Sequence, residues 1–241
     1  MGDVTGRKVL ITGAGSGFGK GAAVELASRG HDVVAACETE EQAAALAAEH
    51  PELTAIKLDV TDPTDVAGAG GLGIDVLINN AGVGIVGPMA SVPLTDVRRS
   101  FEVNVFGMVA LSQAVIPGMR ERSWGRIIDV SSVAMTKHAV EAFTKSLRAE
   151  LAPHGIDVTK VNPGPYGTGF NDQMVNGAAA FIEDGDTETT EIHAVVRQII
   201  LTDQLDPAEV SGALADLVEA DETPLETYLP AGIREILADF L

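Results

Sequence analysis

Short apolar runs alternate along this chain with longer stretches of mixed polarity. The runs are rich in β-branched residues, and they lie at 8–12, 32–37, 53–58, 74–79, 126–131 and 157–161, with a last candidate at 226–229. Each run has the length of a strand, and a strand that is apolar at nearly every position is buried on both faces. Between the runs, apolar residues recur at helical spacing over 19–29, 40–49, 95–119, 136–151, 191–201 and 207–220. A brief helix is also expected between the third and fourth runs.

Strands that alternate with helices at this spacing form βαβ crossovers, so the sheet is expected to be parallel. We therefore predict an α/β fold, a Rossmann-type doubly wound parallel sheet with helices on both faces. No internal repeat and no linker divides the sequence, and residues 1–241 are expected to form a single domain. A ligand of such a sheet lies at the carboxyl ends of the strands.

The first strand is followed by glycines at every second position, Gly13, Gly15, Gly17 and Gly19. A buried strand, a glycine turn and a helix N-terminus together form an anion site, because backbone N–H groups point outward and the helix dipole adds partial positive charge. Glycines also let a pyrophosphate approach the backbone without meeting a Cβ. The turn does not end in Gly-Lys-Ser/Thr, which excludes a P-loop, and a plain glycine-rich turn is the remaining alternative.

Composition narrows the possible partners. The chain has 16 Lys and Arg against 35 Asp and Glu, a net charge of −19, which argues against nucleic acid or an anionic membrane surface. The single cysteine, Cys37, excludes an intrachain disulfide. No apolar run approaches the roughly 20 residues of a membrane span, and the polar N-terminus lacks a signal segment, so the protein is expected to be cytoplasmic. His138, His154 and His193 stand alone, and no metal site is expected.

Several motifs follow one another in a fixed order between Lys8 and Phe170: T-G-A-G-S-G-F-G, L-D-V, N-N-A-G, N-V-F-G, D-V-S-S-V-A, T-K-H-A-V-E-A-F-T-K-S-L and V-N-P-G-x-x-x-T. In this order they resemble the short-chain dehydrogenase/reductase family. The resemblance implies a single Rossmann-type domain that depends on NAD(P). It implies hydride transfer between the nicotinamide cofactor and a small-molecule secondary alcohol or ketone. It also implies assembly as a homodimer or homotetramer through long helices.

The resemblance assigns cofactor-binding roles to residues at the strand ends. Those at the pyrophosphate turn would be Gly13, Ser16, Gly17, Phe18 and Gly19; those beside the adenine would be Asp59 and Val60; those beneath the ribose would be Asn80, Ala81 and Gly82; and those at the nicotinamide end would be Pro163, Gly164 and Thr168.

The resemblance also assigns catalytic roles. Asn104 would hold the active-site helix and a proton-relay water, and Ser132 would hydrogen-bond the substrate carbonyl. Lys137 would contact the nicotinamide ribose and lower the pKa of the catalytic tyrosine. Each residue has a plainer interpretation: Asn104 as a satisfied polar residue in a helix, Ser132 as a cap of the next segment, and Lys137 as a surface lysine.

The family's catalytic tyrosine lies four residues before the lysine, on the same helix face. Val133 occupies that position here, and Ser132 stands only five positions before Lys137, whereas the family normally has about a dozen more residues between them. Two interpretations follow. Either the complete protein carries a segment with the tyrosine that the printed sequence lacks, or the deletion is real and the chain binds a dinucleotide without turnover. Dehalogenation of haloalcohols, a third possibility on this fold, is disfavoured by the intact glycine turn.

The end of the second strand decides the expected cofactor. Cys37 ends the strand and Glu38 follows it, where a carboxylate accepts hydrogen bonds from a ribose 2′-OH and repels a 2′-phosphate. No Lys or Arg lies between Arg29 and Lys57. We therefore expect NAD over NADP, with a solvent-facing Glu38 as the alternative.

The segment 166–206 takes the place of the family's variable substrate lid. Residues 166–190 are expected to be loop-like, with the acidic run 183–191 mobile. Met174, Val175 and Phe181 could cover an apolar substrate or pack the lid to the body. Tyr166 lacks a lysine one turn away, so it is expected to line the pocket or pack the loop rather than act as the acid. Tyr228 is expected to be structural.

Overall fold

The computed structural model describes residues 6–85, 87–131, 136–183 and 185–233. Seven strands form one sheet in the order β3-β2-β1-β4-β5-β6-β7, and every neighbouring pair is parallel. The order reverses between β1 and β4, which makes this the switch point of a doubly wound sheet. The strands are β1 (Lys8–Thr12), β2 (Asp32–Cys37), β3 (Thr54–Lys57), β4 (Val76–Asn79), β5 (Gly125–Val130), β6 (Ile156–Pro163) and β7 (Glu226–Leu229).

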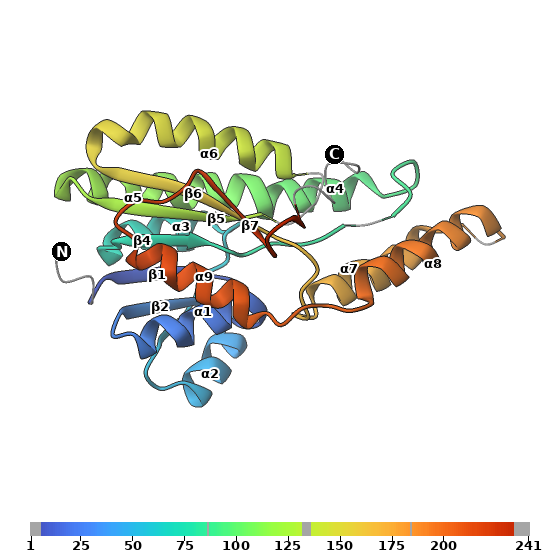
Figure 1. The fold of residues 1–241 in the computed structure, drawn as a ribbon, viewed down its shortest axis with the longest axis horizontal. Coiled ribbons are helices and arrows are strands. Elements are labelled where there is room, and N and C mark those ends of the chain that lie inside the picture. Colours follow the sequence, from blue (N-terminus) through green and yellow to red (C-terminus); the bar gives the residue numbers. More distant parts are fainter. Residues whose placement is uncertain (1–5, 86, 132–135, 184, 234–241) are drawn as a thin grey trace.

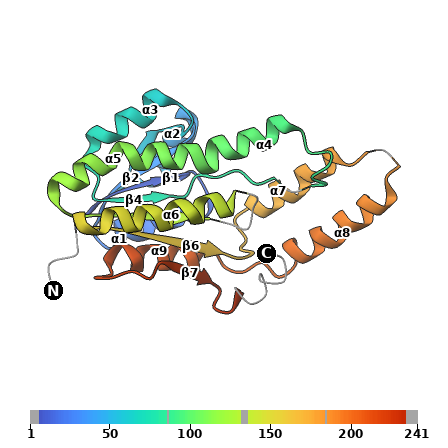
Figure 2. The same ribbon diagram turned by 90° about the horizontal axis from the view of Figure 1, so that it is seen from above.

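Helices cover both faces of the sheet, as Figures 1 and 2 show. One face carries α1 (Gly17–Ser28), α2 (Glu40–Glu49) and α9 (Ala208–Glu219), and the other carries α3 (Pro63–Ala69), α5 (Met108–Arg122) and α6 (Lys137–Leu151). The remaining helices are α4 (Leu94–Phe101), α7 (Phe170–Ala178) and α8 (Thr187–Leu201). The predicted fold class is therefore confirmed.

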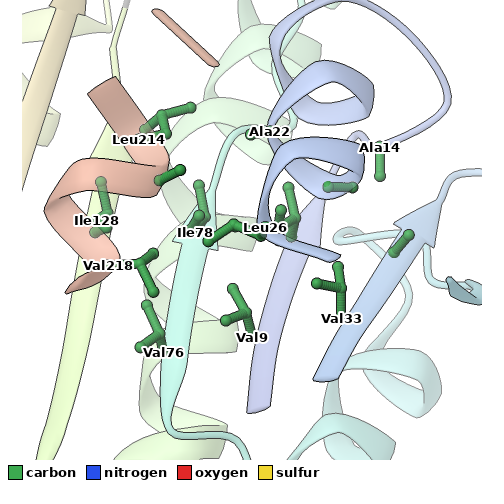
Figure 3. Close-up of a cluster of buried hydrophobic side chains, with 14 of the residues drawn as sticks. Val9, Ala14, Ala22, Leu26, Val33, Val76, Ile78, Ile128, Leu214 and Val218 are labelled. Carbon is green, nitrogen blue, oxygen red and sulfur yellow. The ribbon is translucent and has the colours of Figure 1, made fainter. Parts of the chain in front are cut away.

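The strands bury both faces because their side chains alternate between two cores. In β1, Val9 and Ile11 point to the α1 side, whereas Leu10 points to the α5 side. Figure 3 shows the first of these cores, in which Leu26 of α1 and Leu214 of α9 meet the strands. The alternation explains why the strands read as unbroken apolar runs in the sequence.

Local chemistry sets the helix ends. The Asp62 side chain accepts hydrogen bonds from the backbone N–H groups of Thr64 and Asp65, and Pro63 supplies a fixed φ at the first position of α3. Gly30 follows α1 with φ +87°, a conformation that favours glycine after a helix. The brief helix expected after β3 is thus confirmed as α3, extended by a 3₁₀ turn at Gly70–Leu72.

The helix predicted over 95–119 is present, but it contains an irregularity. The segment Glu102–Gly107 between α4 and α5 is a π-helix, so the helical path is continuous from Leu94 to Arg122. Within the described residues, this helix is long and apolar enough by length and composition to cross a membrane. Its inner side chains, among them Leu111 and Val115, belong to the core against the sheet.

The prediction of a loop over 166–190 is wrong. Helix α7 begins at Phe170, a 3₁₀ turn follows at Ala179–Phe181, and α8 begins at Thr187. The Asp186 side chain accepts a hydrogen bond from the Thr189 N–H, so this part of the acidic run caps α8 rather than forming an open loop. Figure 1 shows α7 and α8 extending away from the sheet.

Candidate functional site

A cleft of about 430 Å³ opens at the carboxyl ends of the strands. Residues after β1, β2, β3, β4, β5 and β6 line it, together with side chains from the α4–α5 helix and from the start of α7. The predicted site residues that it brings together are Gly13, Ser16, Gly17, Phe18, Glu38, Asp59, Val60, Asn80, Ala81, Gly82, Asn104, Pro163 and Thr168. Gly19, Gly164 and Lys137 are not among the described residues that line it.

The glycine turn is tightly packed against the end of β4. A Cβ on Gly13, which has φ +65°, would lie 2.9 Å from the Ala81 Cα, and a Cβ on Gly19 would lie 2.5 Å from the Gly13 carbonyl oxygen. Contacts this short exclude any side chain at either position. Gly19 therefore acts from behind the turn, because it lets α1 approach the backbone that faces the cleft.

Asn80 fixes this arrangement. Its Nδ2 donates to the Thr12 carbonyl at 2.9 Å and to the Gly13 carbonyl at 3.3 Å. In return, the Thr12 hydroxyl oxygen accepts hydrogen bonds from the backbone N–H groups of Asn80 and Ala81, each at 3.0 Å. The segment 80–82 therefore joins the ends of β1 and β4, and it forms one wall of the cleft.

Asp59 and Val60 lie at the end of β3. The Asp59 Oδ1 accepts hydrogen bonds from the backbone N–H and the hydroxyl of Thr61, at 2.8 and 2.7 Å. These bonds hold the carboxylate over its own turn. Val60 is nearly buried and packs beside Gly107 of the π segment.

Glu38 has a partner that local sequence does not reveal. Its Oε1 accepts a hydrogen bond from the Arg99 Nη2 of α4 at 3.0 Å, and its backbone N–H donates to Gln42 Oε1 at 3.1 Å. Arg99 comes 61 residues later in the chain and also lines the cleft. Lys20 of α1, a basic residue closer to Glu38 in the sequence than Arg99, forms an ion pair with Glu49 at 2.7 Å.

Asn104 lies inside the π segment and joins three parts of the site. Its Oδ1 accepts from the Val83 N–H at 2.8 Å, and its Nδ2 donates to the Val83 carbonyl at 2.8 Å and to the Thr136 hydroxyl at 3.2 Å. The amide therefore pairs with both polar groups of one backbone residue after β4 and also reaches the residue before α6. A π turn at such a position is typical of functional sites.

A second cavity of about 200 Å³ adjoins the cleft beneath α7. Its walls are mostly apolar and include Val83, Ile85, Met174 and Phe181, and it shares Arg99 with the cleft. Val175 is fully buried within the lid instead, and its carbonyl lies 2.9 Å from His193 Nε2 of α8. Met174 and Phe181 thus face a cavity, whereas Val175 packs the lid.

Comparison with known proteins decides the family. The family model described as short chain dehydrogenase matches residues 7–179. The chain belongs to this family. Dehydrogenase/reductase SDR family member 9 of Homo sapiens is 38% identical over 193 residues, which cover 71% of this chain and 60% of that protein. The chain therefore spans less than two thirds of that relative.

Two further similarities span most of the chain. Retinol dehydrogenase 8 of Homo sapiens is 32% identical over 250 residues, which cover 91% of this chain and 80% of that protein. The crystal structure of a short-chain dehydrogenase from Streptomyces avermitilis superposes with a TM-score of 0.82 at 29% identity, and covers 98% of this chain and 93% of that one.

The structure describes only some of the residues to which the family resemblance assigns catalytic roles. Ser132 and Val133 lie outside the described residues. Lys137 begins α6, is buried, and has its Nζ 5.9 Å from the centroid of the Tyr228 ring. Lys137 is thus not the surface lysine of the plainer interpretation, and the roles of Ser132 and Lys137 stay predictions.

Tyr166 packs the loop after β6. It is fully buried, its ring meets Phe18 edge to face at 5.6 Å, and its hydroxyl donates to Glu209 of α9 at 2.8 Å. Burial, with the hydrogen bond to Glu209 and its charge, raises the pKa of Tyr166, which makes the phenol a poorer proton donor. The interpretation of Tyr166 as a packing residue agrees with this geometry.

Sequence reasoning missed Asp129 of β5. The carboxyl is fully buried and accepts hydrogen bonds from Asn79 Nδ2 at 2.9 Å and from the Thr144 hydroxyl at 2.8 Å, so it joins β4, β5 and α6. Burial raises its pKa to about 6. An acidic residue between the apolar residues Ile128 and Val130 of a buried strand was the signal. Within the described residues, no cluster of three or more metal-ligating side chains exists.

Proposed function

We propose that this chain is a nicotinamide-dependent oxidoreductase that transfers hydride between its cofactor and a secondary alcohol or ketone. The observation that carries the proposal is the glycine turn locked against the end of β4, where Gly13 and Gly19 leave no room for a Cβ. Such a turn before a helix N-terminus fits a dinucleotide pyrophosphate. Membership of the short-chain dehydrogenase family supports the reaction class.

The residues at the strand ends fit this cofactor. The backbone N–H groups of 13–19 would hold the pyrophosphate, Asp59 and Val60 would flank the adenine, and Pro163 and Thr168 would hold the nicotinamide end. When bound, the nicotinamide supplies the carbon that gives or accepts hydride. We propose NAD as the preferred cofactor, supported by Glu38 at the end of β2, whose carboxylate suits a 2′-OH.

On the substrate side, Asn104 would anchor the backbone that follows β4. Its hydrogen bonds keep Val83 and Thr136 in place beside the proposed nicotinamide end, and Thr136 directly precedes Lys137 at the start of α6. The apolar cavity beside Met174 and Phe181 favours a substrate with an apolar group next to its alcohol carbon. The name of the relative retinol dehydrogenase 8 agrees with an alcohol substrate.

The test combines binding, turnover and mass. Titration calorimetry with NAD⁺ and NADH is expected to give saturable binding, and NADH oxidation is expected with at least one member of a panel of apolar ketones. The intact mass of the natural protein is expected to exceed 25.0 kDa by about a dozen residues, which would supply the tyrosine. A mass of 25.0 kDa together with binding but no oxidation would support the non-catalytic interpretation instead.

We also propose that the protein is a cytoplasmic homodimer or homotetramer that associates through its long helices. Phe106, on the π segment, is 55% exposed, and Phe101 and Val109 of the same long helix are partly buried. Aromatic side chains are enriched in protein interfaces, which supports the proposed assembly. Light scattering after gel filtration is expected to give two or four times the monomer mass, and a monomer would contradict this assembly.

A further inference from the structure

The cleft has an unusual charge distribution for a site that would receive a dinucleotide. Among the described residues that line it, Arg99 is the only Lys or Arg, whereas Glu38 and Asp59 are both acidic. The chain as a whole carries a net charge of −19. A cofactor that brings two or three phosphate groups therefore meets one cationic side chain in this cleft.

Arg99 is positioned at the end of the cleft where the two cofactors differ. Its guanidinium donates to Glu38 Oε1 at 3.0 Å, and Glu38 follows β2, where the adenosine ribose of a doubly wound fold lies. Lys20 of α1 pairs with both oxygens of Glu49, at 2.8 and 2.7 Å, and does not line the cleft. Arg99 is thus the cation available to a phosphate at this end.

The Glu38–Arg99 pair is also able to open. The two side chains are 57% and 49% exposed, and ion pairs this exposed contribute little to stability. The hydrogen bond between them uses one carboxylate oxygen, Oε1, and one terminal guanidinium nitrogen, Nη2. A guanidinium has further N–H groups, and it matches a phosphate in a bidentate manner.

We propose that Arg99 is a specificity-determining residue that lets the protein accept NADP as well as NAD. With NAD, Arg99 stays on Glu38 Oε1, and the remaining carboxylate oxygen accepts the ribose 2′-OH. With NADP, the guanidinium leaves Glu38 and pairs with the 2′-phosphate, which offsets the repulsion from the carboxylate. The inference rests on the proposed nicotinamide function, and it makes the NAD preference a modest one.

The experiment measures affinities for NAD⁺ and NADP⁺ by titration calorimetry. The variants are Arg99→Gln, Glu38→Gln and the double variant, with Arg98→Gln as the matched control, since Arg98 is an exposed neighbour on the same helix that does not line the cleft. Circular dichroism melting curves check that each variant folds. These surface changes leave the core untouched.

Arg99→Gln is expected to weaken NADP⁺ binding about tenfold and to leave NAD⁺ within about twofold, because a charge-assisted hydrogen bond is lost only with NADP⁺. Glu38→Gln is expected to strengthen NADP⁺ binding about tenfold, and this gain is expected to disappear in the double variant. Arg98→Gln is expected to change neither affinity beyond the effect of salt.

Two results would overturn the inference alone. One is an equal loss of both affinities in Arg99→Gln, which would make Arg99 a general phosphate contact. The other is a Glu38→Gln gain that persists in the double variant. If the unchanged protein binds neither NAD⁺ nor NADP⁺, the proposed function fails as well, so the two failures are distinguishable.

Discussion

Asp129→Asn is expected to remove a pH dependence from the stability of the fold. The Asp129 carboxylate accepts hydrogen bonds from Asn79 Nδ2 and from the Thr144 hydroxyl, but that hydroxyl also lies 2.9 Å from the Val140 carbonyl. One hydroxyl proton cannot serve both acceptors fully. A protonated carboxyl can instead donate to Thr144, whose own proton then goes to Val140. The site can thus accommodate the neutral acid, which burial favours.

The magnitude follows from the pKa. Burial raises the pKa of Asp129 from 3.8 to about 6, with the hydrogen bonds from Asn79 and Thr144 and the charge of Lys160 only partly opposing the rise. Between about pH 4 and pH 6 the native state keeps a proton that the unfolded state has released, so the free energy of unfolding falls as the pH rises through this window. At about 1.4 kcal/mol for each pH unit, the loss is about 3 kcal/mol, and it persists above pH 6.

The asparagine amide mimics the neutral acid, since its oxygen can accept from Asn79 while its Nδ2 donates to Thr144. The free energy of unfolding of Asp129→Asn, relative to the unchanged protein, is therefore expected to rise by about 3 kcal/mol between pH 4 and pH 8. Urea denaturation followed by circular dichroism measures this difference. Glu121→Gln, which removes an exposed carboxylate of α5, is the control. A difference between Asp129→Asn and the unchanged protein that stays constant from pH 4 to pH 8 would refute the reasoning.

Three further predictions test the site. Gly19→Ala places a Cβ 2.5 Å from the Gly13 carbonyl oxygen, so calorimetry is expected to show lost NAD⁺ binding, and urea denaturation a loss of about 1–3 kcal/mol; wild-type affinity would contradict the packing of the turn. Tyr166→Phe is expected to cost about 1 kcal/mol of stability through its lost bond to Glu209 and to keep its turnover, so a rate loss above about tenfold would show a catalytic phenol. Asn104→Ala removes the partner of both backbone polar groups of Val83 and is expected to lower kcat by at least about tenfold. Steady-state kinetics measure this change, and an unchanged kcat would contradict the prediction.

The sheet was predictable because its strands are buried on both faces. The bounds of β1, β2 and β7, and those of α2, coincide with the ranges expected from the pattern. The helices α7 and α8 were partly missed because they extend from the body and contribute little to the core. None of the α8 residues is buried, so the first half of this helix has no apolar stripe to detect. The Asp186 cap was the local signal that could have found its start.

The predicted cofactor-binding residues could be expected to lie close together for a different reason. Its residues follow directly after strands, and the parallel sheet brings the strand ends to one edge. Contacts between distant elements were not predictable in this way. Arg99 meets Glu38 across 61 residues, and Asp129 meets Asn79 across 50. No periodicity in a single sequence relates such positions. For this reason the sequence around Glu38, which lacks Lys and Arg, did not reveal that Arg99 brings a positive charge to this end of the cleft.

The π segment Glu102–Gly107 changes how successive residues are spaced around the axis of the long helix. A π turn accommodates an extra residue, and one residue corresponds to about 100° of rotation in an α-helix. Because the π turn absorbs this extra residue, α4 and α5 face as they would on a regular α-helix that is one residue shorter. Arg99 can reach over the cleft while Leu111 faces the sheet. Deletion of one residue from this segment is therefore expected to restore a regular α-helix, to leave Arg99 and Leu111 facing as they do, and to displace Asn104 from its hydrogen bonds with Val83.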